Sequence, residues 1–322
     1  MREIGLIDVD GHNFPNLALM RISAYHKMIG DNVEWWFGDL KHYDIVYKSK
    51  VFSDEYTQDV PDPLNADLVV KGGTGYCIKN VDGKERYDKV KDSKLPAEVE
   101  SMFPDYSIYP QYDFAVAMTS RGCPNNCDFC HVSKKEGRCS VKVGNLSDFW
   151  DFSKYQHREI KVLDPNITAC KEKRELFKQY RDAEIPKIGK YSTKPMIDFT
   201  QGLDIRLLDD DDIDDINHMR IKNIHFAWDN ADQDLKDKFK SYSDKTVHKP
   251  KGYFGTVYVL TNFNSKIEQD LYRVYTLRDM NYNPYVMVYN KSNAPKDVKR
   301  LQRWCNNRKI FKSVKNFEEY ID

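Results

Sequence analysis

The segment FAVAMTSRGCPNNCDFCHVS (114–133) joins a short apolar run to three closely spaced cysteines. The run FAVAM predicts a buried strand, and Gly122 and Pro124 predict that a loop follows it. Cys123, Cys127 and Cys130 lie in this loop at CxxxCxxC spacing. Barrel-type α/β folds gather their chemistry in the loops at the carboxyl ends of strands, so we expect a functional loop here.

Three thiols at this spacing favour an iron–sulfur cluster. Thiolates are the natural ligands of such clusters, and a cubane bound by three protein thiolates keeps one iron open to another ligand. A structural zinc site would need a fourth ligand, which His131 could supply, but no second CxxC follows. A disulfide exchanger would need a CxxC at the start of a helix and no third cysteine. The spacing of Cys123, Cys127 and Cys130 therefore favours an iron–sulfur cluster over a zinc site or a disulfide exchanger.

Strands and helices alternate on both sides of the cysteine loop, which predicts an α/β fold. Downstream, helical crossovers separate the strands and predict a partial (βα)6 TIM-type barrel, because a closed one needs eight strands. The expected strands are 114–118, 160–163, 196–200, 223–228, 256–260 and 285–289. Thr168 is expected to precede one helix, Ser265 and Glu268 to form a capping box on another, and Pro295 to open a C-terminal helical extension.

Upstream, the pattern predicts a smaller Rossmann-like parallel sheet. Its expected elements are strands at 4–9, 32–37, 43–47 and 66–70 and a helix at 17–28, and the proline-punctuated stretch 82–110 is interpreted as a connector. We therefore expect two domains, 1–112 and 113–322.

Composition restricts the class of protein. The chain has 322 residues, with 50 Lys and Arg against 50 Asp and Glu, so the molecule as a whole is not a polyanion binder. Seven cysteines in a chain of this length do not form a secreted disulfide scaffold. The acidic N-terminal segment excludes a signal peptide, and no apolar run is long enough to span a bilayer. We expect a soluble, cytoplasmic protein that does not use a membrane.

RGCPNNCDFC, with Phe129 before the last cysteine and a strand before the loop, resembles the radical S-adenosylmethionine enzymes over about residues 113 to 290. The resemblance implies that the open iron of the cluster chelates S-adenosylmethionine. It also implies that an electron donor such as flavodoxin or ferredoxin drives reductive cleavage to a 5′-deoxyadenosyl radical, which abstracts hydrogen from an unidentified substrate. Cys123, Cys127 and Cys130 are then the catalytic and metal-binding residues, and Phe129 occupies the aromatic position of the motif.

Residues at the ends of the later strands are the candidates for holding the cosubstrate. VLDPNIT (162–168) stands where the family has glycine-glycine-glutamate, and Asp164 and Asn166 are candidates for the methionine end. A plain helix cap is the alternative for Asn166.

In DFTQGLDIRLL (198–208), Gln201 and Asp204 are expected to bind ribose hydroxyls, and Arg206 to bind a carboxylate. An internal ion pair of Arg206 with Asp204 or Asp198 is the alternative. Asp229 and Asn262 are candidates by position after their strands. The acidic run 209–215 is interpreted as a helix start rather than a metal site.

DVDGHNFPN (8–16) and KGGTGY (71–76) resemble the histidine loop and the glycine-rich loop of cobalamin-binding domains. Bound cobalamin would imply a cobalamin-dependent radical methyltransferase. Pro15 stands where that pattern has glycine, and a layer that lines the substrate site is the alternative for this region.

Two further functions stay open. Residues 291–322 carry nine Lys and Arg against four Asp and Glu, which allows a tRNA-modification enzyme, although an amphipathic helix that closes the barrel explains the same charges. A non-catalytic iron–sulfur redox or binding protein is the other alternative.

Overall fold

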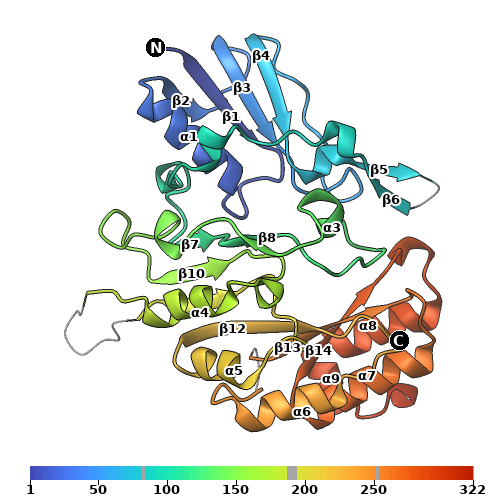
Figure 1. Ribbon diagram of the computed structural model, residues 1–322. Coiled ribbons are helices and arrows are strands. Elements are labelled where there is room, and N and C mark those ends of the chain that lie inside the picture. The colour runs from blue at the N-terminus through green and yellow to red at the C-terminus, as the bar shows by residue number, and fades with distance from the viewer. Residues whose placement is uncertain (82–83, 187–193, 251–253, 322) are drawn as a thin grey trace. The chain divides into compact units, whose positions relative to one another are not determined.

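The computed structural model describes residues 1–81, 84–186, 194–250 and 254–321 (Figure 1). The chain divides by internal packing into two compact units. Unit 1 comprises Met1–Met118, Gly122–Arg138 and Gly144–Arg158, and unit 2 comprises Thr119–Arg121, Cys139–Val143 and Glu159–Asp322.

A four-stranded parallel sheet in the order β2-β1-β3-β4 organises unit 1. The strands are β1 (Glu3–Asp8), β2 (Asn32–Trp35), β3 (Tyr43–Ser49) and β4 (Ala66–Gly72). Helix α1 (Leu17–Met28) occupies the predicted residues, and the Asn16 side chain caps it by accepting a hydrogen bond from the Leu19 amide at 3.2 Å. All four predicted strands are confirmed.

The rest of unit 1 contains more structure than a connector. The added elements are η1 (Thr74–Cys77), β5 (Ile78–Val81), β6 (Lys84–Tyr87), η2 (Lys89–Lys91), α2 (Ala97–Glu100), η3 (Tyr106–Ile108), β7 (Phe114–Ala117), α3 (Val132–Lys135) and η4 (Leu146–Asp148). Strands β5 and β6 pair antiparallel. The interpretation of 82–110 as a plain connector is therefore wrong for 84–110, and positions 82–83 lie outside the described residues.

A second sheet, in the order β14-β13-β12-β11-β10-β7, organises unit 2. Its strands are β10 (Glu159–Val162), β11 (Met196–Phe199), β12 (Arg220–Ala227), β13 (Thr256–Thr261) and β14 (Asn283–Val288), and the register between consecutive members is parallel. The short strands β8 (Ser120–Arg121) and β9 (Val141–Lys142) pair antiparallel. Every strand predicted for this half of the chain is present.

Helices follow the strands of unit 2 in turn. They are η5 (Ile167–Ala169), α4 (Lys173–Asp182), α5 (Asp210–Asn217), α6 (Lys236–Lys245), α7 (Ile267–Asp279), η6 (Lys291–Asn293), α8 (Lys296–Asn306), α9 (Arg308–Ser313) and η7 (Phe317–Glu319). Two predicted helix starts are wrong. Thr168 lies within η5 before α4, and α7 begins after Lys266, whose amide donates to the Gln269 side chain at 2.9 Å.

Alternation along the strands decides which face of the second sheet the helices cover. Phe199 of β11 contacts Phe177 and Tyr180 of α4, and Phe226 of β12 contacts Phe239 and Tyr242 of α6. Val286 of β14 belongs to a buried cluster with residues of α7, α8 and α9. These apolar residues contact the helices that follow the strands, so the residues between them in sequence point to the opposite face.

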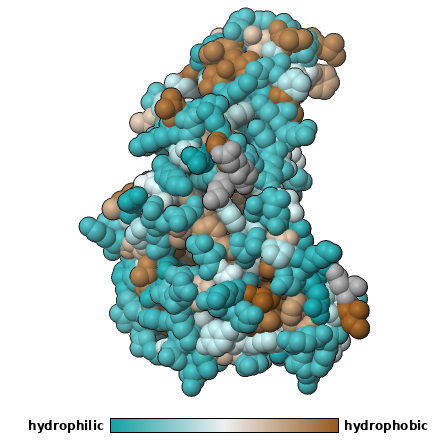
Figure 2. All heavy atoms as spheres, turned by 90° about the vertical axis from the view of Figure 1, so that its right-hand side faces the viewer, coloured by the Kyte–Doolittle hydropathy of each residue, from teal (hydrophilic) through white to brown (hydrophobic). Residues whose placement is uncertain are grey.

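The outcome is an α/β protein with two parallel sheets, as the sequence predicts. Within the described ranges, no helix is both long enough and apolar enough to cross a bilayer. The face of the molecule drawn in Figure 2 is mainly hydrophilic, with apolar side chains gathered in small groups.

Candidate functional site

The three motif cysteines lie in an irregular loop of unit 1. Gly122 opens the loop with φ of +90°, a backbone conformation that favours glycine. The Cys123 amide donates to the Gly137 carbonyl at 3.1 Å, and the Cys130 amide donates to the Cys127 carbonyl at 3.0 Å. Each of the three cysteines is partly exposed. The loop ends at α3, where the Val132 amide lies 3.5 Å from the Cys130 sulfur.

The β5–β6 hairpin contacts the end of this loop. His131 Nε2 lies 3.4 Å from a Glu85 carboxylate oxygen, and the His131 ring stacks on Tyr87 with centroids 6.2 Å apart. Lys135 of α3 forms an ion pair with Asp92 at 3.3 Å. The sequence analysis missed these neighbours, although the Asp-Gly dipeptide at 82–83 is a hairpin signal.

Asp164 holds the backbone that leads into the cysteine loop. Its carboxylate accepts hydrogen bonds from the Thr119 amide (3.0 Å), the Thr119 hydroxyl (2.8 Å) and the Ser120 amide (2.5 Å). The residue is buried, and burial raises the pKa of Asp164 to about 6 despite these donors. These bonds give Asp164 a structural role within unit 2, and its expected contact with methionine stays a prediction.

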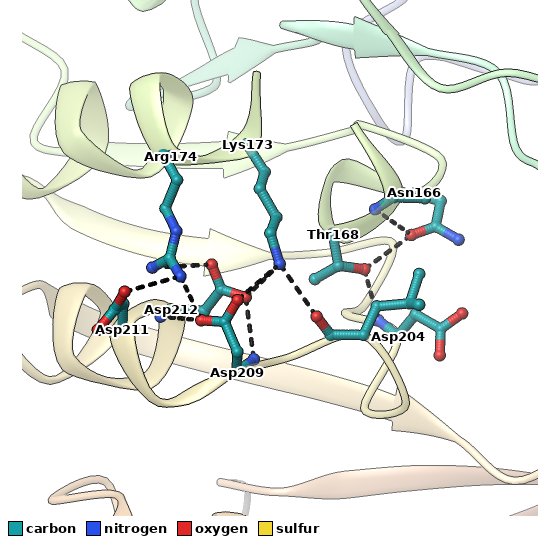
Figure 3. Close-up of polar contacts among 10 residues, drawn as sticks. Asn166, Thr168, Lys173, Arg174, Asp204, Asp209, Asp211 and Asp212 are labelled. Atoms are coloured by element: carbon teal, nitrogen blue, oxygen red, sulfur yellow. Dashed lines mark hydrogen bonds and ion pairs between the residues drawn. The ribbon is translucent and has the colours of Figure 1, made fainter. Parts of the chain in front are cut away.

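Asn166 caps a turn of helix, which was the alternative in the sequence. Its side-chain oxygen accepts from the Ala169 amide at 3.2 Å and from the Thr168 hydroxyl at 2.7 Å. The Thr168 hydroxyl in turn accepts from the Asp204 amide at 3.1 Å (Figure 3). The loops after β10 and β11 are therefore tied together at the carboxyl edge of the sheet.

Asp204 and Arg206 form the internal ion pair that was the alternative to ligand binding. Arg206 Nε and Nη2 donate to the two Asp204 oxygens at 2.7 and 2.5 Å. The Asp204 side chain is 9% exposed and that of Arg206 is 36% exposed. Of the two ion pairs considered for Arg206, the structure contains the one with Asp204.

The remaining candidates differ in their surroundings. Burial raises the pKa of Asp229 to about 6, against the favourable charges of Arg273 and Arg206. Asn262 has φ of +60°, and its amide donates to the Tyr289 carbonyl at 2.8 Å. Gln201 is exposed. Asn166, Asp204, Arg206 and Asp229 thus gather at the ends of β10–β12, whereas Asn262 lies after β13.

The acidic run after Leu208 starts α5, as predicted. Asp209 caps the helix by accepting from the Asp212 amide at 3.0 Å, and Lys173 and Arg174 neutralise the cluster (Figure 3). Asp212 is fully buried and bonded to Lys173 Nζ at 2.6 Å, so part of the run is packed inside unit 2 and not solvated.

The N-terminal loops of unit 1 make packing contacts within that unit, and bound cobalamin stays a prediction. The His12 ring packs edge-on against Trp35, with centroids 4.1 Å apart. The backbone carbonyl of His12 accepts a hydrogen bond from the Tyr112 hydroxyl. A Cβ on Gly73 would lie 2.2 Å from the Lys50 carbonyl oxygen, so this glycine serves contact within the chain. Asp10 accepts from the amide of Val51 at 2.6 Å. Packing contacts thus account for the two loops whose sequence resembled a cobalamin site.

The basic C-terminal segment is built around an amphipathic helix. Leu301 and Trp304 of α8 are buried in the cluster shared with α7 and α9, and Val298 of the same helix is also buried. Arg300 is held by the carbonyls of Phe317 (2.9 Å) and Tyr320 (2.8 Å), so this cation serves the fold of the segment.

Within the ranges that the structure describes, no group of three or more His, Cys, Asp or Glu is arranged to hold a single metal ion. The sequence matches no protein-family model and no curated protein.

Proposed function

We propose that the protein is a radical S-adenosylmethionine enzyme whose 4Fe–4S cluster is ligated by Cys123, Cys127 and Cys130. The observation that carries the proposal is the CxxxCxxC loop with its aromatic Phe129, which follows the strand β7 and the short strand β8. When bound, the cluster and S-adenosylmethionine would supply the 5′-deoxyadenosyl radical that abstracts hydrogen from the substrate. The fold proposed for unit 2 together with β7 is a partial (βα)6 barrel.

The donor set of the loop suits this group. All three thiols are partly exposed on one irregular loop, so a cluster could be assembled on them from solvent. A cubane distributes its thiolate ligands over different irons, and three ligands that converge on one point are therefore not required. A closed zinc site would require that convergence.

Residues of unit 2 would hold the polar parts of the cosubstrate. The Arg206 guanidinium has the chemistry to bind a carboxylate, and Asp204 fixes that guanidinium with two hydrogen bonds. Asp229 is a candidate acceptor for a hydroxyl or an ammonium group, because it is partly buried and its carboxyl interacts electrostatically with Arg206 and Asp204. Asp164 and Asn166 would contribute by fixing the loops that carry these groups.

The first test measures the cluster itself in anaerobically reconstituted protein. Iron and sulfide content and the electron paramagnetic resonance spectrum of the dithionite-reduced protein are compared for wild type, Cys127→Ala and Cys139→Ala. Cys139 is an exposed cysteine outside the motif and therefore a matched control. We expect four irons in wild type and Cys139→Ala and a severe loss in Cys127→Ala. Added S-adenosylmethionine should change the spectrum of wild type and of Cys139→Ala.

Retention of four irons by Cys127→Ala would contradict the ligand assignment. A cluster whose spectrum ignores S-adenosylmethionine would instead favour the non-catalytic redox or binding role. The physiological electron donor, a flavodoxin or ferredoxin, and a cytoplasmic location are parts of the same proposal.

A further inference from the structure

The face of the second sheet opposite the helices carries a group of polar and aromatic side chains. Alternation along the strands places these residues on one face, because their neighbours in sequence contact the helices. They are Glu159 and Lys161 of β10, Asp198 of β11, Asn223 and His225 of β12, Tyr258 of β13, and Tyr285 and Met287 of β14.

The charges of this face cancel one another. Lys161 Nζ lies 3.0 Å from both Glu159 Oε1 and Asp198 Oδ2. Lys222 interrupts the alternation of β12 at the register shift between β11 and β12, and it forms an ion pair with the other oxygen of Glu159. Asn223 also donates to Asp198 Oδ2, at 3.1 Å. Two lysines thus balance two carboxylates, so the face has no net charge to offer an ionic ligand.

Two buried polar atoms at the centre of the face have no hydrogen-bond partner among the described residues: Asp198 Oδ1 and His225 Nδ1. Asp198 is 4% exposed, and His225 Nε2 lies 4.0 Å from Asp198 Oδ1, too far for a hydrogen bond. Burial lowers the pKa of His225, which keeps the imidazole neutral and able to donate at one nitrogen and accept at the other. Buried polar atoms without partners are uncommon in folded proteins, and a ligand that bonds to them removes their cost.

Aromatic groups continue the face from His225 to the sheet edge. The His225 and Tyr258 rings stack with centroids 5.7 Å apart and an interplanar angle of 28°. Tyr285 meets Tyr258 edge-on at 5.9 Å. Tyr285 and Met287 are 41% and 45% exposed, so the outer part of this aromatic surface is accessible.

We propose that this face binds a neutral planar heteroaromatic ring with N–H or amino donors, the chemistry of a nucleobase. Asp198 Oδ1 would accept from the ring, and His225 would exchange a hydrogen bond with it. The exposed Tyr285, two strands away from His225, would contact the group that the ring carries or the next base of a single strand. That this face is the substrate surface of the enzyme rests on the proposed function. Binding of the ring itself requires no cluster. A free nucleoside and a base within a single-stranded RNA share this chemistry.

The test measures binding of guanosine, cytidine and a mixed-sequence single-stranded oligoribonucleotide to the full chain, by saturation-transfer NMR for the nucleosides and fluorescence anisotropy for the oligonucleotide. Adenosine is left out because S-adenosylmethionine itself carries adenine. The variants are Tyr285→Ala and His225→Phe, and the second keeps a ring of similar size without its nitrogens. Tyr272→Ala is the matched control, because Tyr272 is a 45% exposed tyrosine on the helix α7.

We expect wild type and Tyr272→Ala to bind at least one probe, and both face variants to bind it roughly five- to a hundredfold more weakly, the range for loss of one stacking or hydrogen-bonding partner. Nucleoside binding that behaves this way identifies a free ligand, and binding of the oligonucleotide alone identifies a nucleic acid. Wild type that binds no probe, or face variants that bind as well as wild type, would overturn the proposal. Neither result would affect the iron and spectroscopic tests of the cluster.

Discussion

Asp164→Asn should change the pH dependence of stability in a direction that the structure fixes. The native carboxyl has a pKa of about 6 against an ordinary value of 3.8, because burial disfavours its charged form. At a pH between these two pKa values, the Asp164 carboxyl is protonated in the native state and ionised in the unfolded state. The contribution of Asp164 to stability is therefore largest at low pH and falls as pH rises through this window.

The size of the effect follows from the same two values. From pH 4.5 to pH 7 the free energy of unfolding of wild type should lose about 2 kcal/mol through Asp164. The variant has no such titration. Its amide nitrogen faces the Thr119 amide, which donates to the carboxylate in wild type, and this mismatch costs about 1–3 kcal/mol at every pH. The variant should therefore be clearly less stable than wild type at pH 4.5 and close to it at pH 7.

Urea denaturation followed by tryptophan fluorescence at pH 4.5, 5.5, 6.5 and 7 measures this difference. Asp229 also has a pKa raised to about 6, but it is present in both proteins, so its contribution cancels in the comparison. A difference in unfolding free energy that stays constant across this pH range would refute the reasoning. Asp164 would then be ionised in the native state throughout, as a ligand of an ammonium group would be.

Two further predictions concern one residue inside each unit, Arg273 of unit 2 and Gly73 of unit 1. Arg273→Leu should destabilise the protein by about 3–5 kcal/mol in urea denaturation, because it removes a buried guanidinium bonded to four backbone carbonyls and leaves the buried Asp270 carboxylate without its ion-pair partner; an unchanged midpoint would contradict this. Gly73→Ala should lower the melting temperature more than Gly30→Ala, since both glycines have positive φ but only Gly73 faces a backbone oxygen, that of Lys50, at 2.2 Å from the added Cβ. Equal shifts for the two variants would show that this contact relaxes at no cost.

Periodicity in the sequence was sufficient to predict the two parallel sheets. The strands are short apolar runs between caps and glycines, and α1 occupies the predicted residues because Asn16 and Gly30 mark both ends. The β5–β6 hairpin was missed because its strands are polar and carry almost no apolar alternation. The capping box of α7 was misplaced by one residue, since Lys266 and Gln269 supply the contact expected from their neighbours.

The candidate site was predictable in part. The cysteine spacing is a local pattern, so the sequence alone identifies it. Whether Arg206 pairs with Asp204 or with Asp198 depends on how the loop after β11 turns, which no local pattern encodes. The polar face of the second sheet is visible in the sequence as polar residues that alternate with apolar ones in IKV (160–162), IDF (197–199) and IHFA (224–227). Asp198 and His225 are two of these polar residues. Recognising it requires knowing which face the helices cover.

The most direct test of the central claim is production of 5′-deoxyadenosine. The reconstituted protein is reduced anaerobically with dithionite, S-adenosylmethionine is added, and the product is quantified beside Cys127→Ala and Cys139→Ala. The account predicts 5′-deoxyadenosine from wild type and Cys139→Ala and none above background from Cys127→Ala. Absence of product from wild type that holds four irons, assayed with and without the nucleosides and the oligoribonucleotide proposed as ligands, would contradict it.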